Sequence, residues 1–226
     1  MRRRGRAGFL SCMSGKTTRG ELDRVEQIFD RIADGYDRQF GWSERVLLGD
    51  ARRWAIERAR GTVVEIGVGS GLNLPLYGAG VERVVGVDLS ERMLDLARAR
   101  SAPVPVELRH GDVQQLDLPA GSADTVVSTY TFCTIPDPGA AAAAAWRVLR
   151  PGGVFVAVEH GPARARPVAA LMRLVEPLAV RFAADHLTRE PVGYLTEAGF
   201  TLEHFARTGR GGVVFRVLAR KPEQDR

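Results

Sequence analysis

The stretch that decides the fold is Thr62-Val63-Val64-Glu65-Ile66-Gly67-Val68-Gly69-Ser70-Gly71. Its first five residues are rich in β-branched side chains and predict a buried strand. The three glycines that follow predict a sharp turn at which a ligand can approach bare backbone. We expect a short helix over residues 70–77, whose N-terminus would offer free N–H groups to an anion. The stretch therefore predicts a ligand-binding loop between a strand and a helix.

The spacing of these glycines differs from that of dinucleotide-binding loops. Those loops carry Gly-x-Gly-x-x-Gly, whereas this one reads Gly-x-Gly-x-Gly and has Leu72 where the third glycine would stand. An acidic residue, Glu65, also lies shortly before the first glycine. The loop thus favours a ligand with a smaller anionic end, such as an amino-acid carboxylate, over a pyrophosphate. An NAD-dependent dehydrogenase is the alternative that this spacing disfavours.

Acidic residues follow the next two predicted strands. Asp88 comes after the strand 83–87, and its carboxylate can accept hydrogen bonds from both hydroxyls of a ribose. Asp112 comes after the strand 104–108 and can accept from an adenine amino group. Since ligands of such sheets bind outside the carboxyl ends of the strands, we expect the loop and both carboxylates to form one site. Taken singly, Asp88 could start a helix and Asp112 could belong to a turn.

Strands and helices alternate along the rest of the chain. The expected elements are strands at 123–129 and 153–159, helices at 90–100, 138–149 and about 190–198, and strands at 200–207 and 213–219. The last two strands are joined by a glycine-rich turn and form a hairpin. This order predicts an α/β fold: a Rossmann-like doubly wound sheet of about seven strands, mostly parallel with an antiparallel C-terminal hairpin strand.

The residues before the sheet predict a helical cover. Apolar side chains recur at helical spacing over residues 21–38, and Gly35 with its neighbours is expected to end that helix. Ser43 has the character of an N-cap for a second helix. Residues 1–20 carry basic side chains and no acid, which predicts a disordered basic tail. Residues 21–226 are then expected to form a single domain with a lid-like segment at about 163–190.

Composition disfavours several classes of protein. Of the net charge of +5, the first twenty residues carry +6, so the remainder carries −1 and no stable nucleic-acid partner is expected. No apolar run is long enough to cross a bilayer. Two cysteines and four scattered histidines lack metal-ligand spacing, so no metal site is expected. A cytoplasmic location is the simple default for a chain with so few cysteines.

Taken together, these motifs resemble those of the class I S-adenosylmethionine-dependent methyltransferases. The matching stretches are residues 65–71, 87–90, 111–112, 123–127 and 149–153, and the resemblance spans about residues 25–220. Within that family, residues 29–33 and Tyr36-Asp37 resemble the ubiquinone and menaquinone C-methyltransferases of the type 11 group. The C-terminal half, through Cys133, Glu159-His160 and residues 187–190, resembles the alkyl thiol methyltransferases and their phospholipid N-methyltransferase-like relatives.

This resemblance implies S-adenosylmethionine as the cofactor. The glycines of the loop would flank its methionine part, and Glu65 would orient the loop. Asp88 would hold the ribose, and Asp112 with Val113 would hold the adenine. Ser128 and Thr129 would lie nearest the sulfonium, and Tyr36 would help to close the N-terminal cover over it. The implied cofactor residues are Tyr36, Glu65, Gly67, Gly69, Gly71, Asp88, Leu89, Asp112, Val113 and Ser128.

Methyl transfer requires the protein mainly to align the acceptor with the methyl group. Displacement at a sulfonium is in-line and has a good leaving group, so the site mainly positions the acceptor and excludes water. A base is needed only where the acceptor must lose a proton. The candidates are His160, Glu159, His186 and Tyr130. An ordinary turn residue is the alternative for either histidine, and Cys133 is expected to be a small buried residue.

Residues 163–183 bear on the methyl acceptor. Apolar side chains alternate there with arginines, which fits a lid helix, an apolar acceptor pocket or a surface that touches membrane lipid. We therefore expect a small, apolar acceptor, namely a thiol, a quinol or a lipid amine, and a monomer or homodimer with peripheral membrane contact left open. The alternatives are an RNA or protein methyltransferase and a non-catalytic S-adenosylmethionine-binding protein. Residues 128–131 lack the Asn/Asp-Pro-Pro-aromatic motif of enzymes that methylate base nitrogens.

Overall fold

The computed structural model describes residues 17–43 and 50–223, and for residues 39–43 the backbone alone. The described residues hold one sheet of seven strands in the order β3-β2-β1-β4-β5-β7-β6. The strands are β1 (Gly61–Ile66), β2 (Val81–Asp88), β3 (Val106–His110), β4 (Ala123–Thr129), β5 (Leu149–His160), β6 (Thr201–Thr208) and β7 (Val214–Arg220). Strands β1 to β5 pair in parallel, and β7 pairs antiparallel with both β5 and β6. The expected fold, including the antiparallel hairpin strand, is confirmed.

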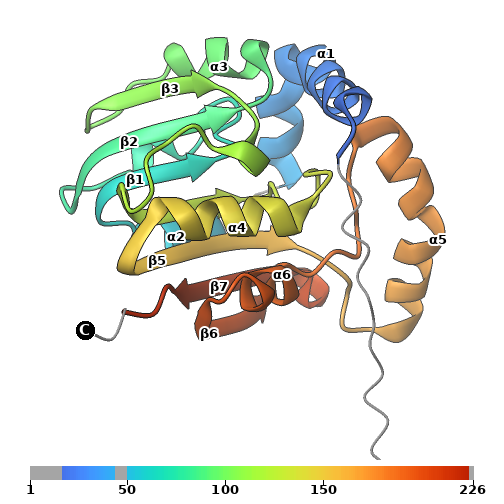
Figure 1. The fold of residues 1–226 in the computed structure, drawn as a ribbon. Helices are drawn as coiled ribbons and strands as arrows, with labels where there is room; N and C mark the ends of the chain where they lie inside the picture. The colour runs from blue at the N-terminus through green and yellow to red at the C-terminus, as the bar shows by residue number, and fades with distance from the viewer. Residues whose placement is uncertain (1–16, 44–49, 224–226) are drawn as a thin grey trace, which may run out of the picture.

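Helices cover both faces of this sheet (Figure 1). The helices are α1 (Arg19–Ser43), α2 (Ala51–Ile56), α3 (Glu91–Arg98), α4 (Pro138–Val148), α5 (Arg166–Ala183) and α6 (Pro191–Glu197). Buried side chains such as Phe155 and Phe200 fill the space between the sheet and the α4–α6 layer. Ile56 and Leu94 belong to the core on the opposite face, under α2 and α3. The sheet is thus doubly wound, and its apolar strands are buried on both sides.

The prediction of a helix directly after the glycine loop is wrong. Residues 70–77 hold only a 3₁₀ turn, η2 (Leu74–Leu76), which is preceded by irregular backbone. Pro75 in this turn lacks an N–H, and three residues are too few to build a macrodipole. The loop itself, rather than a helix N-terminus, must therefore bind whatever lies against it.

The prediction that the first helix ends at Gly35 is also wrong, since α1 continues to Ser43. Contacts on both sides of Gly35 hold the helix in place: Ser90 donates to Asp30 (2.5 Å), and Ser70 donates to Asp37 (2.5 Å). Such tertiary contacts outweigh the roughly 1 kcal/mol that an interior glycine costs a helix. Ser43 is the last residue of α1 and therefore does not cap a second helix; residues 44–49 lie outside the described residues.

The start of α1 is defined by a capping box. Thr18 Oγ1 accepts from the Glu21 N–H (3.3 Å), and Glu21 Oε2 accepts from the Thr18 N–H (2.8 Å). This reciprocal pair satisfies two N–H groups at the helix N-terminus and lowers the pKa of Glu21 through the Thr18 backbone hydrogen bond. The helix thus begins within the expected tail, whose residues 1–16 lie outside the described part of the chain.

Candidate functional site

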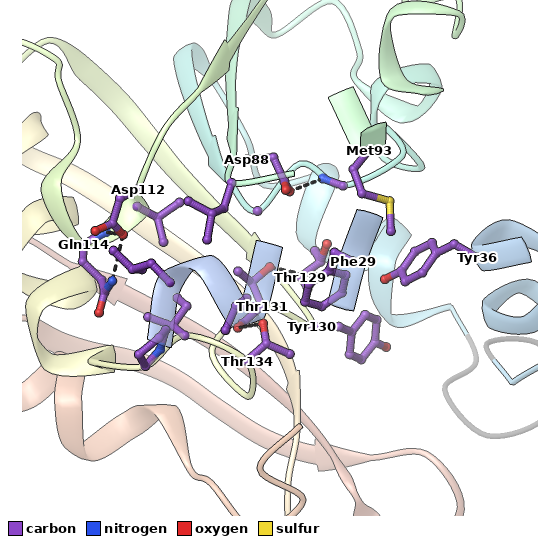
Figure 2. A pocket seen from close by; sticks show the side chains of 18 residues that line it. Phe29, Tyr36, Asp88, Met93, Asp112, Gln114, Thr129, Tyr130, Thr131 and Thr134 are labelled. Carbon is purple, nitrogen blue, oxygen red and sulfur yellow. Dashed lines mark hydrogen bonds between the residues drawn. The ribbon is translucent and has the colours of Figure 1, made fainter. Parts of the chain in front are cut away.

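A pocket lies at the carboxyl ends of β1 to β4, and α1 passes over it (Figure 2). Seven of the ten expected cofactor residues line this pocket: Tyr36, Gly67, Gly69, Asp88, Leu89, Asp112 and Val113. The other three, Glu65, Gly71 and Ser128, are not among the lining residues. The sheet therefore brings the loop and both acidic residues to one cavity.

The glycines of the loop meet different surroundings. Gly67 has φ +66°, and a Cβ there would lie 2.3 Å from Thr131 Cγ2. Gly69 has φ +55°, and a Cβ there would stand in open space. A Cβ on Gly71 would meet Leu74 and Ala97 of the core. Gly67 and Gly71 therefore allow close packing of the protein on itself, whereas Gly69 leaves room beside the pocket for a ligand.

The carboxylate of Asp88 joins the glycine loop to the end of β2. Its Oδ2 accepts from the Gly69 N–H (2.8 Å), and its Oδ1 accepts from the Ser90 N–H (3.0 Å). Burial raises the pKa of Asp88, while the hydrogen bonds from Ser90 and Gly69 lower it in part. Each oxygen keeps a further lone pair for a donor in the pocket, so Asp88 can receive a pair of hydroxyl groups.

Asp112 presents a carboxylate oxygen that the described residues do not use. Its Oδ1 accepts from the backbone N–H (2.9 Å) and the side-chain Nε2 (2.8 Å) of Gln114. Its Oδ2 is buried, and none of the described residues donates a hydrogen bond to it. A buried acceptor without a donor is costly unless a ligand supplies one. An adenine amino group would do so, and together with the open space at Gly69 this oxygen fits S-adenosylmethionine.

Glu65 lies behind the loop rather than in the pocket. It is buried, and its carboxylate accepts from Asn73 Nδ2 (2.7 Å) and from the Tyr77 hydroxyl (2.7 Å). Burial raises the pKa of Glu65 to about 7, against the lowering effect of the Tyr77 and Asn73 hydrogen bonds. This network fastens the end of β1 to the turn at residues 73–77.

Tyr36 and Phe29 project from α1 over the pocket, with their rings 6.5 Å apart in an edge-on arrangement. Burial raises the pKa of Tyr36 strongly, partly offset by Arg52. Hydrogen bonds from Ser90 to Asp30 and from Ser70 to Asp37 fix α1 across the mouth of the site. The helix therefore forms a roof over the pocket.

Ser128 and Glu159 form a buried network next to the pocket. The Ser128 hydroxyl donates to Glu159 Oε1 (2.6 Å), and the Thr131 and Phe132 N–H groups donate to Oε2 (2.9 and 3.2 Å). Burial raises the pKa of Glu159 to about 7, and the Ser128 and Thr131 hydrogen bonds lower it in part. These contacts fit a positioning residue for the loop 130–132 better than the base expected at Glu159.

Tyr130 is the one candidate base that lines the pocket among the described residues. Its backbone has φ +56°, a left-handed conformation rare for a residue with a side chain. The Glu159 network on one side and the Arg52 guanidinium, 5.6 Å from its ring centroid, on the other hold it there. In this strained conformation Tyr130 lines the pocket and also packs against the core under α2.

The two candidate histidines lie outside the pocket lining. His160, at the end of β5, has its Nε2 3.0 Å from Asp185 Oδ1. His186 has its Nδ1 3.5 Å from Glu176 Oε1, and burial together with Arg189 lowers its pKa. Neither ring can reach the cavity directly in this arrangement.

Thr129, expected beside the sulfonium, lines the pocket, whereas nine other lining residues were not predicted from the sequence: Leu22, Val25, Phe29, Met93, Gln114, Thr131, Thr134, Ile135 and Pro136. Met93 lies in the first turn of α3, shortly after Asp88, and Gln114 follows Asp112 in η3 (Val113–Gln115). Both lie just beyond motifs that were found, so extending each motif by one turn would have included them. The apolar residues of α1 carried a helical signal but no indication of which face meets the site.

Known proteins share both the sequence pattern and the fold. A family model described as a methyltransferase domain matches residues 64–157. A phosphatidylethanolamine N-methyltransferase of Cereibacter sphaeroides is 37% identical over 183 residues, covering 76% of this chain and 88% of that protein. A demethylmenaquinone methyltransferase of Deinococcus radiodurans is 32% identical over 163 residues, covering 66% of each.

Two solved structures have a similar fold at lower identity. One is a methyltransferase of Haloferax volcanii in complex with the Trm112 methyltransferase activator, with a TM-score of 0.69 and 20% identity over 86% of this chain and 98% of that one. The other is a S-adenosylmethionine-dependent methyltransferase of Thermotoga maritima, with a TM-score of 0.65 and 24% identity over 86% of this chain and 99% of that one. At these identities the likeness concerns the fold alone.

Proposed function

This chain belongs to the S-adenosylmethionine-dependent methyltransferases, and on that premise we propose that it methylates the amine of a lipid headgroup at a membrane surface. The enzyme class and the cofactor follow from the family. The acceptor is our proposal, and the observation that carries it is the exposed apolar face of α5.

Helix α5 buries little of its apolar surface. Ala169 is its one buried residue, while Leu174 is 75% exposed and Phe182 is 70% exposed. Val168, Leu171, Val175 and Leu178 are also exposed, and most of these side chains recur at intervals of three and four residues along one face. Exposed apolar side chains gathered in this way mark a surface that meets another apolar phase. A lid helix packed on the sheet, the alternative in the sequence, would have buried them.

The charges of α5 favour a lipid bilayer as the apolar phase that this helix contacts. Arg166, Arg173 and Arg181 are exposed on the helix, against one acidic residue, Glu176. An apolar stripe flanked by arginines is typical of helices that lie in the interface of an anionic bilayer. None of the described helices is long and apolar enough to cross a membrane, so the contact that we propose is peripheral.

The position of α5 connects this face with the pocket. Figure 1 shows α5 beyond the carboxyl ends of the parallel strands, beside α1. Arg24 of α1 donates from Nη2 to the carbonyl oxygens of Val180 (3.1 Å) and Arg181 (2.8 Å). The roof of the pocket is thus fastened to the proposed membrane helix, and a headgroup would have a short way to travel from the bilayer to the site.

The residues of the pocket support the roles that we propose for them. Asp88 would hold the ribose, and Asp112 the adenine. When bound, S-adenosylmethionine supplies a methyl group on a sulfonium, open to in-line displacement by an amine. The roof formed by Tyr36 and Phe29 would exclude water, and Tyr130 would line the side from which the acceptor enters.

A quinol is the second candidate acceptor, because the demethylmenaquinone methyltransferase relative is nearly as similar in identity. Its tail would meet the same α5 face. The two candidates differ in the accepting atom, so they are separated by the identity of the methylated product rather than by membrane binding.

The test of the proposal uses the double variant Leu174→Glu/Phe182→Glu. We expect it to lose binding to vesicles of phosphatidylethanolamine and phosphatidylglycerol in a flotation assay, and to lose at least about tenfold of its rate on those vesicles, because charged residues on the apolar face oppose insertion. Its rate on dispersed short-chain phosphatidylethanolamine should stay unchanged.

The matched control is Leu202→Glu, since Leu202 is exposed (38%) on β6 and apart from α5. That variant should behave as the wild type on both substrates. An equal loss on vesicles and on the dispersed lipid, or no loss on either, would contradict a membrane-facing α5.

A further inference from the structure

Three side chains with metal-binding chemistry meet beside the pocket. Cys133 comes from the loop after β4, His160 from the end of β5, and Asp185 from the segment after α5. One ligand atom from each residue lies within 4.8 Å of the others, and His160 Nε2 is 3.0 Å from Asp185 Oδ1. None of the three belongs to the pocket lining, so the cofactor site does not account for them.

The hydrogen bonding of this cluster is incomplete. Asp185 Oδ1 is buried, yet none of the described residues makes a hydrogen bond to it. Its 3.0 Å contact with His160 Nε2 therefore has the distance of an ion pair without the alignment of a hydrogen bond. Such a buried carboxylate oxygen needs a cation against it, which either a protonated His160 or a bound metal ion would supply.

The three segments are held together by contacts outside the cluster. The His186 N–H donates to the Cys133 carbonyl (2.9 Å), and Arg189 Nη1 donates to the carbonyls of Phe132 (2.7 Å) and Ile135 (2.6 Å). Ala184, just before Asp185, has the left-handed φ of +54°. The protein thus holds the donor atoms close together by its own contacts, as a preformed binding site requires.

We propose that Cys133, His160 and Asp185 bind a divalent transition-metal ion, for which Zn²⁺ is the best match. Thiolate, imidazole and carboxylate are all zinc ligands, and three protein ligands leave one position of a tetrahedral ion open. The thiolate and the carboxylate would together balance the two positive charges of the ion. A neutral assembly removes the cost of burying two like charges side by side.

A reactive cysteine fits these observations less well. Cys133 is 4% exposed, whereas a nucleophilic or redox-sensing thiol must be accessible. Its Sγ donates at 3.6 Å to the Tyr130 carbonyl, which is a weak partner. A protein-only Cys-His-Asp relay would need an aligned His160–Asp185 hydrogen bond, and the 3.0 Å contact between Nε2 and Oδ1 lacks that alignment.

The proposed ion would lie next to the acceptor side of the pocket. Thr134, the residue after Cys133, and Tyr130, whose carbonyl faces the Cys133 sulfur, both line the cavity. The ion would also fasten Asp185, and with it the end of α5, to the loop after β4. This assignment does not depend on the identity of the methyl acceptor.

The test uses the full chain, freed of metal with a chelator under reducing conditions and titrated with Co²⁺ as a spectroscopic substitute for Zn²⁺. We expect visible absorption bands of tetrahedral cobalt and a thiolate-to-cobalt charge-transfer band in the near ultraviolet. The charge-transfer band should disappear in Cys133→Ser and persist in Cys12→Ser, which removes the other cysteine of the chain.

Zinc affinity, measured by competition with a chromophoric chelator, supplies the second readout. His160→Gln and Asp185→Asn should each weaken Zn²⁺ binding at least about tenfold. His186→Gln is the matched control and should bind as the wild type, since the His186 ring faces Glu176 instead. S-Adenosylhomocysteine binding checks that every variant is folded. A wild-type chain without the charge-transfer band, or His160 and Asp185 variants with unchanged zinc affinity, would overturn the proposal.

Discussion

The backbone N–H of Gly69 donates a 2.8 Å hydrogen bond to Oδ2 of Asp88, and this contact joins the glycine loop after β1 to the end of β2. Two motifs that are separate in the sequence thus form one wall of the pocket. Because the same carboxylate would also receive the ribose, its loss should affect both the loop and the ligand.

Asp88→Ala should weaken S-adenosylmethionine binding at least about tenfold, since a hydrogen bond to a charged group contributes roughly 1.5–3 kcal/mol. Asp88→Asn should weaken it less, because the amide oxygen can still accept from the Gly69 N–H. Isothermal titration calorimetry with S-adenosylhomocysteine measures both. Unchanged affinity in Asp88→Ala would remove Asp88 from the cofactor site.

Asp112→Ala should lower the affinity for S-adenosylhomocysteine about tenfold, because the buried Oδ2 would lose its proposed adenine amino donor. The affinity for S-inosylhomocysteine, which lacks that amino group, should change little. Asp117→Ala, at an exposed acid nearby, is the matched control. If Asp112→Ala weakened both ligands equally, the residue would shape the pocket without reading the adenine.

Gly67→Ala should destabilise the fold far more than Gly69→Ala. Both residues have positive φ and should each cost about 1–2 kcal/mol on that ground. At Gly67 the new Cβ would also collide with Thr131, whereas at Gly69 it would meet open space. Urea unfolding compares the two variants. Gly69→Ala should instead weaken cofactor binding, and equal stability losses would contradict this difference.

Glu65 should make stability depend on pH. Its pKa is about 7 in the folded protein and 4.5 ordinarily, so between these values the folded state holds a proton that the unfolded state has released. The free energy of unfolding should therefore fall as pH rises through this window, by up to about 3 kcal/mol.

Glu65→Gln carries no titrating group and keeps an acceptor for Asn73 or Tyr77. Its stability relative to the wild type should rise with pH across the same window. Denaturant unfolding at a series of pH values gives the difference directly. A difference that is constant with pH would mean that Glu65 is ionised in the folded protein throughout.

The sheet and the position of the pocket were accessible from sequence because strong local signals specify them. The β-branched run before Gly67, the acid at the end of β2 and the acid after β3 are set by short-range patterns, and parallel strands bring their carboxyl ends together. The continuation of α1 through Gly35 was missed because contacts such as Ser90 with Asp30 come from distant parts of the chain.

The Cys133–His160–Asp185 cluster could not be predicted from the sequence for a different reason. No short spacing links these residues, and the absence of metal-ligand spacing led to the expectation of no metal site. The loop after β4, the end of β5 and the end of α5 meet only when the sheet and α5 are assembled. Sites built from three separate segments leave no periodic trace in the sequence.

Methylation of a lipid amine, the activity that we propose for this enzyme, is best tested by identifying the methylated product. The purified chain is incubated with S-adenosylmethionine labelled in the methyl group and with mixed vesicles of phosphatidylethanolamine, phosphatidylglycerol and demethylmenaquinol, with a soluble alkyl thiol added. We expect label in N-methylated phosphatidylethanolamine. Label in menaquinol or in a thioether, with none in the phospholipid, would contradict it.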